Sequence, residues 1–254
     1  MLVTITRAVS SNITRCELTH LAREPIDLER AKTQHRQYEE LLVELGCKLI
    51  KLPAEPELPD SVFVEDTAIV LDELAVITRP GAESRRPETT SVAEILKKYR
   101  KLIYIEPPGT LDGGDVLQVG KSLYVGLSHR SNQQGIDQLR KILSAYGYIV
   151  TAVELHDCLH LKSGVTRVAD DTLLINKQWV DSNPFGNMRF IEIAPQEPFA
   201  ANAVRIYNTL IYPEAFPTTR QKLKAQGIDL RTVDASELAK AEGGVSCCSL
   251  IFEV

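Results

Sequence analysis

The chain has 254 residues, of which 44% are hydrophobic and 25% charged, proportions typical of an ordinary globular protein. Its net charge of −5 and the lack of any lysine- or arginine-rich run argue against nucleic acid or an anionic membrane surface as the main partner. No apolar run approaches the roughly 18 residues of a membrane span, and Met1 to Thr4 begins no secretory signal. We therefore expect a cytoplasmic protein.

The five cysteines are scattered along the chain: Cys16, Cys47, Cys158, Cys247 and Cys248. Because they are odd in number and form no CxxC motif, we expect neither a disulfide framework nor a structural zinc site. In a reducing compartment, such thiols are either inert or catalytic. Nothing in the sequence calls for a cofactor.

The first third of the chain begins with a predicted strand over Met1 to Val9. Apolar residues on one face predict a helix from Leu28 to Leu45, which Gly46 ends. A short strand follows over Lys48 to Leu52. After it comes a proline-rich acidic loop that carries Asp60, Glu65 and Asp66.

Four further units then follow in the order strand, strand, helix, strand. We predict their hairpins over residues 67–71 with 75–78, 116–119 with 123–125, 165–168 with 172–175, and 203–207 with 210–212. We predict helices near residues 87–99, 133–146 and 218–226. Pro184 and Gly186 interrupt the space where the third of these units would place its helix. The closing strands are expected over 102–105, 149–153, 190–193 and 229–233.

The two ends of the chain complete a fifth unit. The apolar residues 250–253 could pair with residues 2–5, and the first helix and strand would supply the rest. We therefore predict an α/β propeller of five ββαβ modules, one domain over residues 1–254 whose termini meet in one module. Closing a ring in this way leaves few exposed sheet edges. The alternative is a plain α/β sandwich with an accidental rhythm.

Polar residues occupy the same point of each unit, between its last strand and the next hairpin. These residues are Asp66, Asp112, His160, Asn202 and Cys247, which follow one another at intervals of 46, 48, 42 and 45 residues. If the units surround an axis, equivalent loops lie at one end of it. We therefore expect these side chains to converge on one central pocket.

Cys247 and His160 form a candidate nucleophile and acid–base pair, because an adjacent imidazolium lowers a thiol pKa and can move a proton. Gly243 and Gly244 precede the thiol and allow the backbone to approach a ligand closely. Asp112 could orient the imidazole, as a third group does in catalytic triads. The alternatives are a buried cysteine pair at the start of a core strand, and an ordinary turn aspartate.

Other charged residues indicate the chemistry of the substrate. Asp60, Glu65 and Asp66 gather negative charge that suits a guanidinium with several N–H donors. Arg85 and Arg130 could bind a carboxylate, although a lone arginine is also a common surface residue. Together these groups describe a small zwitterion with a cationic head, an arginine-like amino acid.

Five motifs of the chain together resemble the dimethylarginine dimethylaminohydrolase family of the guanidine-modifying pentein superfamily. The motifs, spread in order over essentially the whole chain, are SVFVED (61–66), ITRPGAESRR (77–86), LDGGDV (111–116), LHLKS (159–163) and VSCCS (245–249). The resemblance implies a five-module propeller and hydrolysis of Nω-methylated arginine to citrulline and methylamine or dimethylamine.

Further roles follow from the resemblance alone. Cys247 would attack the guanidinium carbon to form a covalent thiouronium, and His160 would protonate the leaving amine and then activate water. Asp66 and Glu65 would hold the guanidinium head, and Arg85 and Arg130 the carboxylate. The α-amino group would meet the Asp60 side chain and the backbone carbonyls of Leu18 and Ala241. Cys248, the neighbour of Cys247 on an expected strand, should point the opposite way because side chains alternate along a strand.

Two departures from related sequences bear on specificity. Some bacterial members carry glutamate at the position of Asp112, so the shorter side chain can hold His160 differently. Arginine deiminases carry an aspartate at the position of Lys162, and its loss favours methylarginine over free arginine. A citrulline or other ureido hydrolase of the same fold, and a metal-binding or redox-sensing module without turnover, remain open. So does a homodimer.

Overall fold

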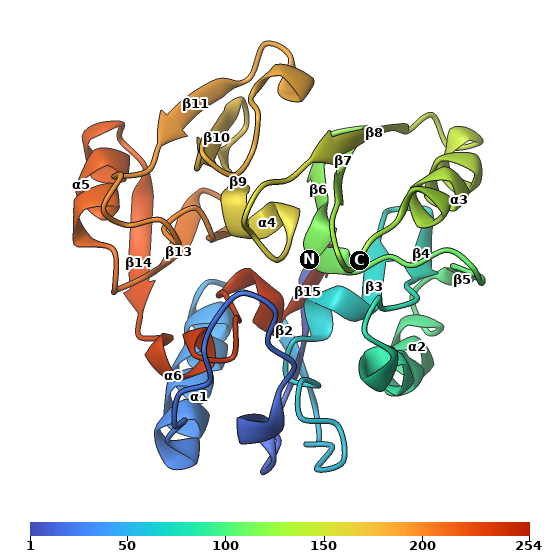
Figure 1. Cartoon of the computed structure of the whole chain (residues 1–254), viewed down its shortest axis with the longest axis horizontal. Helices are drawn as coiled ribbons and strands as arrows, with labels where there is room; N and C mark the ends of the chain where they lie inside the picture. The colour runs from blue at the N-terminus through green and yellow to red at the C-terminus, as the bar shows by residue number, and fades with distance from the viewer.

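The computed structural model describes residues 1–254 and arranges them as five small sheets around a common axis (Figure 1). Each sheet has three strands, in the orders β15-β1-β2, β3-β4-β5, β6-β7-β8, β9-β10-β11 and β12-β13-β14. The strands are β1 (Leu2–Arg7), β2 (Lys48–Leu52), β3 (Ala68–Val70), β4 (Leu74–Ile77), β5 (Lys101–Tyr104), β6 (Val116–Val119), β7 (Ser122–Leu127), β8 (Ile149–Glu154), β9 (Val165–Ala169), β10 (Thr172–Ile175), β11 (Arg189–Glu192), β12 (Val204–Ile206), β13 (Thr209–Pro213), β14 (Asp229–Val233) and β15 (Leu250–Glu253).

The long helices lie at the outside of the ring (Figure 1). The helices are α1 (Leu28–Glu44), α2 (Thr89–Leu96), α3 (Gln133–Ser144), α4 (Leu161–Gly164), α5 (Pro217–Ala225) and α6 (Ser236–Ala239). Six short 3-10 segments lie in the connections between these elements: η1 (Ile13–Arg15), η2 (Val64–Thr67), η3 (Glu83–Glu88), η4 (Gly113–Asp115), η5 (Asn183–Phe185) and η6 (Ser246–Cys248).

Each module combines an antiparallel hairpin with a parallel third strand. In the module that contains α3, β6 pairs antiparallel with β7 and β7 pairs parallel with β8. A parallel pair needs a crossover connection, which α3 supplies. The same pattern of pairing holds in the other modules. The predicted propeller of ββαβ modules is therefore confirmed.

Local sequence explains where the crossover helix α3 begins and ends. The Asn132 side chain accepts a hydrogen bond from the Gly135 N–H at 2.8 Å and so caps the first turn. Ile136, Leu139 and Leu143 recur at helical spacing and are fully buried. Beyond the helix, Gly147 has a φ of +74°, the left-handed conformation that glycine adopts without strain.

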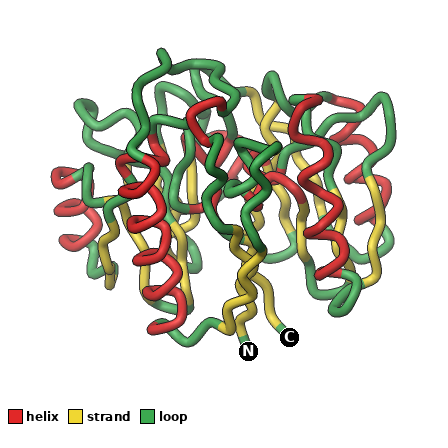
Figure 2. Tube along the Cα trace, turned by 90° about the horizontal axis from the view of Figure 1, so that it is seen from below, coloured by secondary structure: helices red, strands yellow, loops and turns green.

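The two ends of the chain close the ring. Strand β15 pairs antiparallel with β1, with Val3 opposite Phe252, as predicted. The Val254 N–H also donates to the Met1 carbonyl oxygen at 3.0 Å. Seen from the side, the two termini emerge next to each other at one edge of the molecule (Figure 2).

The structure differs from the predicted elements in two places. The helix expected from Pro87 begins as α2 only at Thr89, because Pro87 lies inside the 3-10 segment η3. Between β10 and β11 there is no α-helix but only η5, where Pro184 and Gly186, with a φ of +61°, limit helical propagation. The arrangement of strands is therefore more alike from module to module than the helices are.

Hydrophobic contacts between neighbouring modules hold the ring together. One cluster joins β1 and β15 of the closing module to β4 and α2 of the next, through Val3, Phe252, Ala75, Val92 and Leu96. Full burial of such a side chain contributes roughly 1.5–3 kcal/mol. The helices of the structure include none that is long and apolar enough to cross a membrane.

Candidate active site

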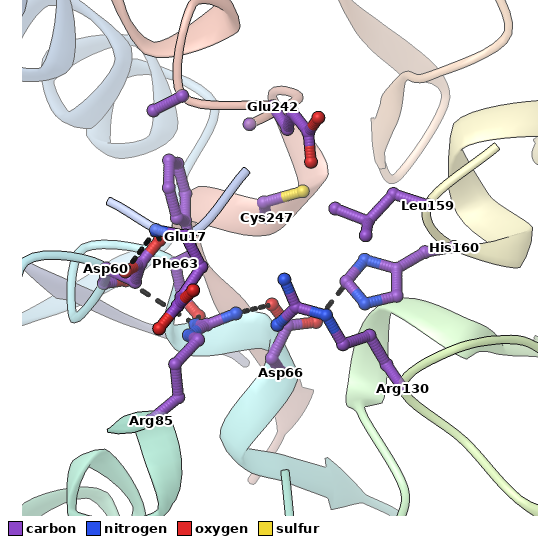
Figure 3. A pocket seen from close by; sticks show the side chains of 12 residues that line it. Glu17, Asp60, Phe63, Asp66, Arg85, Arg130, Leu159, His160, Glu242 and Cys247 are labelled. Atoms are coloured by element: carbon purple, nitrogen blue, oxygen red, sulfur yellow. Dashed lines mark hydrogen bonds and ion pairs between the residues drawn. The ribbon is translucent and has the colours of Figure 1, made fainter. Parts of the chain in front are cut away.

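Three of the five polar residues that were expected to converge line one pocket (Figure 3), whereas Asp112 bonds to His160 outside its lining and Asn202 lines a neighbouring cavity. The three in the pocket wall are Asp66, His160 and Cys247. The remaining lining residues are Glu17, Asp60, Phe63, Arg85, Arg130, Leu159, Ala241, Glu242 and Gly243. The pocket encloses about 10 Å³, room for about one water molecule.

Short helical turns before the hairpins carry these residues inward. Asp66 lies in η2 and Cys247 in η6, while His160 and Asp112 immediately precede α4 and η4. Gly114 of η4 is required because a Cβ there would lie 2.7 Å from both Asp66 Oδ1 and His160 Nδ1. The Gly114 N–H instead donates to Asp66 Oδ1 at 2.9 Å.

Asp112 orients the imidazole of His160. Its Oδ2 lies 3.1 Å from His160 Nε2, and its Oδ1 accepts from the Gly81 N–H at 2.9 Å. Burial disfavours the charged imidazolium, but the carboxylates of Asp66, Asp115 and Asp112 outweigh it and raise the pKa of His160 to about 9. His160 therefore holds a proton at neutral pH.

Asp115 supports this arrangement and was missed as a site residue, although it lies in the LDGGDV motif. It is fully buried, and its Oδ1 accepts from the Leu161 N–H at 2.9 Å, which fixes the backbone next to His160. Its Oδ2 accepts from Ser131 Oγ at 2.6 Å, and that hydroxyl accepts from the Asp112 N–H at 3.0 Å. Burial raises the pKa of Asp115 to about 6.

The Cys247 thiol faces the pocket (Figure 3), whereas Cys248 is buried in a hydrophobic cluster. Burial and the charges of Glu65 and Asp66 raise the pKa of Cys247 to about 12, against the Gly244 N–H, which donates to Sγ at 3.3 Å. The two glycines serve close packing: a Cβ on Gly243 would lie 2.1 Å from the Phe63 ring. The left-handed residue of the turn is Glu242, with a φ of +57°.

Asp66 and Arg85 form a buried ion pair at the floor of the pocket, with Arg85 Nη1 2.7 Å from Asp66 Oδ2. Arg85 also donates from Nε and Nη2 to Glu88, and from Nη2 to the Phe63 carbonyl oxygen. These bonds occupy most of the Arg85 N–H donors, which the sequence analysis expected to bind a substrate carboxylate. Glu88, which has no motif of its own, was missed.

Glu65 lies behind the pocket wall and is not among its lining residues. One of its oxygens accepts from Lys162 Nζ at 2.6 Å and the other from Ser246 Oγ at 2.8 Å. The Ser246 N–H in turn donates to Asn202 Oδ1 at 3.1 Å. Glu65 therefore supports the turn that carries Cys247 rather than facing the guanidinium directly, which differs from the expectation from sequence.

Arg130 and Asp60 lie on the pocket wall, as expected for ligands of the two ends of an amino acid. Arg130 Nη1 is buried without a hydrogen-bond partner, 4.0 Å from Asp112 Oδ2. Asp60 accepts from the Glu17 N–H at 3.1 Å, and burial raises its pKa. Ala241 also lines the pocket, whereas Leu18 packs against the adjacent hydrophobic cluster.

Glu242, which lines this pocket, binds residues 19–21, which also contact Arg130 of the opposite wall and are called the covering segment below. Its carboxylate accepts from the N–H groups of Thr19, His20 and Leu21, at 3.0, 2.5 and 2.6 Å. Thr19 Oγ1 further accepts from Arg130 Nη2 at 3.4 Å. Sequence reasoning missed Glu242, because its partners lie more than 200 residues away.

One group of residues has the composition of a metal site. A ligand atom from each of Asp66, Asp112 and His160 lies within 4.8 Å of the others. A metal requires a neutral imidazole, whereas these carboxylates raise the pKa of His160 to about 9. Asp66 is also paired with Arg85. The arrangement therefore favours a protonated histidine among carboxylates over a metal centre.

Known proteins are similar to this chain in sequence. A family model described as "Arginine deiminase" matches residues 54–216. The N(G),N(G)-dimethylarginine dimethylaminohydrolase of Pseudomonas aeruginosa is 39% identical over 89% of this chain and 90% of its own length. The protein of the same name from Streptomyces coelicolor is 37% identical over 97% of this chain and 95% of its own length.

Solved structures agree with these relatives. A mutant of the Pseudomonas aeruginosa enzyme complexed with citrulline superposes with a TM-score of 0.94 at 36% identity, covering 98% of both chains. A dimethylarginine dimethylaminohydrolase adduct with S-methyl-L-thiocitrulline gives a TM-score of 0.93 at 36% identity, over 99% of this chain and 100% of that one.

The five-module ring and the thiol, imidazole and carboxylates that line its pocket define a pentein hydrolase of guanidino compounds. Within that class, the chain belongs to the dimethylarginine dimethylaminohydrolase family. The family expected from the five sequence motifs is therefore confirmed.

Proposed function

We propose that the protein hydrolyses Nω-methylated arginine to citrulline and methylamine or dimethylamine, with residues 1–254 acting as one catalytic domain. The observation that carries the proposal is the set of groups that line one pocket. These are the Cys247 thiol, the His160 imidazole bonded to Asp112, the Asp66 carboxylate and the Arg130 Nη1 without a partner. Together they are complementary to a zwitterion with a guanidinium head. The related enzymes that carry this activity in their names match over nearly the whole chain.

The substrate cation itself would activate the nucleophile. With its pKa raised to about 12, the Cys247 thiol is almost wholly protonated at pH 7. After burial, the charges of Glu65 and Asp66 are the largest causes of that high pKa. A guanidinium held at Asp66 offsets these charges, so it lowers the pKa of Cys247 where the thiolate is needed.

The reaction then has two steps. His160 already carries a proton, so the Cys247 thiol gives its own proton to water when the substrate cation binds. The thiolate attacks the guanidinium carbon, the bond from that carbon to the methylated nitrogen breaks, and the His160 imidazolium gives its proton to the leaving amine. This leaves a covalent thiouronium and a neutral imidazole. His160 next takes a proton from water, whose oxygen attacks the same carbon. The C–S bond breaks, the hydroxyl proton of the collapsing adduct passes to the Cys247 sulfur, and citrulline leaves with the thiol and the protonated His160 restored.

The contacts divide the binding roles among the remaining residues. Arg130 is the principal ligand for the substrate carboxylate, because its Nη1 has no other partner. Arg85 orients Asp66 from behind through their 2.7 Å ion pair and takes part in carboxylate binding through its remaining Nη1 hydrogen. Asp60 and the carbonyls of Leu18 and Ala241 receive the α-amino group. Glu65 contributes through Ser246 and Lys162.

Lys162 bears on the choice of substrate. Its Nζ pairs with Glu65 at 2.6 Å, so this position offers no second carboxylate to an unmethylated guanidinium nitrogen. We expect kcat/KM for dimethylarginine to exceed that for arginine. Equal or faster turnover of arginine would overturn this specificity. Consumption of citrulline instead of its production would favour the ureido hydrolase.

Two serine substitutions test the assignment of the nucleophile. Cys247→Ser should abolish citrulline formation from dimethylarginine, because a hydroxyl is a far weaker nucleophile than a thiolate. Cys248→Ser is the matched control and should retain turnover, since Cys248 faces the hydrophobic core. Mass spectrometry should show an adduct on Cys247 alone. Loss of turnover only in the Cys248 variant would refute the proposed mechanism.

A further inference from the structure

A second cavity of about 650 Å³ lies beside the catalytic pocket. The two share Leu159, Glu242 and Gly243 as a common wall, and the second cavity extends along His20 and Leu21 of the covering segment to Ala22. Its volume falls within the roughly 300–1,000 Å³ of small-molecule sites, far above that of the catalytic pocket. Of the residues particular to this cavity, only Gly244 and Asn202 are hydrogen-bonded to the turn that carries Cys247, and the reaction proposed above gives none of the others a role.

Aromatic side chains form part of its lining. Trp179 and Phe199 stand edge to face with ring centroids 5.1 Å apart, and Phe216 contributes a third ring. Phe199 is 48% exposed, although it is a large apolar side chain. Trp179 is buried, at 8% exposed, so Phe199 supplies most of the open aromatic surface. Such a surface favours the body of an apolar ligand and, through the ring faces, a cation.

The charged residues of the lining are predominantly acidic. Glu24 and Asp157 are exposed at the cavity and take part in no ion pair. Glu242 is occupied by the N–H groups of the covering segment, and Lys240 is paired with Glu237 at 2.7 Å. Two carboxylates without an ion-pair partner therefore remain in the lining, and its one lysine, Lys240, is held by Glu237 and the Pro25 carbonyl oxygen.

We propose that this cavity is a second binding site, for a small organic cation with an ammonium or guanidinium head and an apolar body. The apolar body packs against Trp179 and Phe199, and the head meets Glu24 and Asp157. The site is separate from the catalytic pocket and does not depend on the function proposed for that pocket. A ligand bound in this cavity would contact the Glu242 turn and the covering segment.

The chain's single tryptophan allows a direct test, because Trp179 lines this cavity and not the catalytic pocket. The full-length protein is titrated with 2-phenylethylammonium, with Trp179 fluorescence as the readout. The neutral 2-phenylethanol serves as a ligand of the same size. We expect a saturable change with the ammonium ion and clearly weaker binding of the alcohol. No saturable change, or equal binding of both compounds, would overturn the proposal.

Matched charge variants test the role of the carboxylates. The double variant Glu24→Gln with Asp157→Asn should weaken binding of 2-phenylethylammonium by at least about threefold, the effect of losing two partly exposed ion pairs. Asparagine suits the φ of +50° at position 157. The control variant, Glu57→Gln with Asp72→Asn, removes the same charge from exposed positions outside the cavity and should leave binding unchanged. Equal affinity in both variants would refute the site.

Discussion

The contact between Glu242 and the covering segment can be tested with a single substitution. In Glu242→Gln, an amide oxygen at the Oε1 position can still accept from the N–H groups of Thr19, His20 and Leu21, but as a neutral acceptor, and Oε2, the second acceptor of the Thr19 N–H, becomes an amide nitrogen. Hydrogen bonds to a charged group contribute roughly 1.5–3 kcal/mol, and neutral ones roughly 0.5–1.5 kcal/mol. Weakening each of these three bonds by about 1 kcal/mol should therefore cost about 3 kcal/mol of closure.

Amide hydrogen exchange measures this opening directly. A loss of about 3 kcal/mol corresponds to roughly a hundredfold faster exchange at Thr19, His20 and Leu21, because 1.4 kcal/mol is a factor of ten. Amides in strand β7 should keep their protection. Glu57→Gln removes the same charge from an exposed position and should leave all rates unchanged. Unchanged exchange at the three amides of the Glu242 variant would refute a closing role for this carboxylate.

Three further predictions follow from individual contacts. Arg130→Met should raise KM for dimethylarginine by at least about a hundredfold, with a smaller effect on kcat, because a buried partner of the substrate carboxylate is lost; an unchanged KM in steady-state kinetics would contradict this role. Alkylation of Cys247 by iodoacetamide should accelerate with pH from about 6 to 9 without a plateau, and guanidinium ion should accelerate it at fixed pH; a plateau near pH 7 in the free protein would oppose substrate-assisted ionisation. In Glu39→Gln, the free energy of unfolding should fall less on acidification than in the parent protein. Burial opposes the charged form of Glu39, but the His35 ring 3.3 Å away and hydrogen bonds from Lys51 and Thr6 lower its pKa from 4.5 to about 2. The stabilisation, about 3 kcal/mol at most, is present above pH 4.5 and lost as the pH falls towards 2; equal loss of stability on acidification of both proteins, followed by urea unfolding, would argue against it.

Local patterns were sufficient to predict the modules. Two-residue turns such as Gly120-Lys121 and the apolar alternation around them define hairpins, because both features depend on residues close together in the chain. The regular spacing from Asp66 to Cys247 then indicated that equivalent turns meet at one end of an axis. The same locality explains the error at α2: a helical pattern near Pro87 does not reveal that η3 precedes the helix.

The roles of individual charged side chains depended on distant partners. Glu65 meets Lys162, 97 residues further along, and Glu242 meets the N–H of Leu21, 221 residues away. Asp112 was predicted correctly as the partner of His160 only because the repeat places both in equivalent turns. No such periodicity distinguishes Arg85, whose donors are largely engaged by Glu88 and Asp66, from Arg130, which keeps a free Nη1.

The sequence by itself determined the five modules, the closure of the ring by its ends, and the thiol, imidazole and carboxylate chemistry of the pocket. These features follow from short-range periodicity and from residue types that recur at one position of each module. The tertiary structure alone decided which carboxylates face the pocket, which arginine keeps a free donor, and that Glu242 holds the covering segment. A charged group's partner depends on distance and burial in space, and neither can be read from separation along the chain.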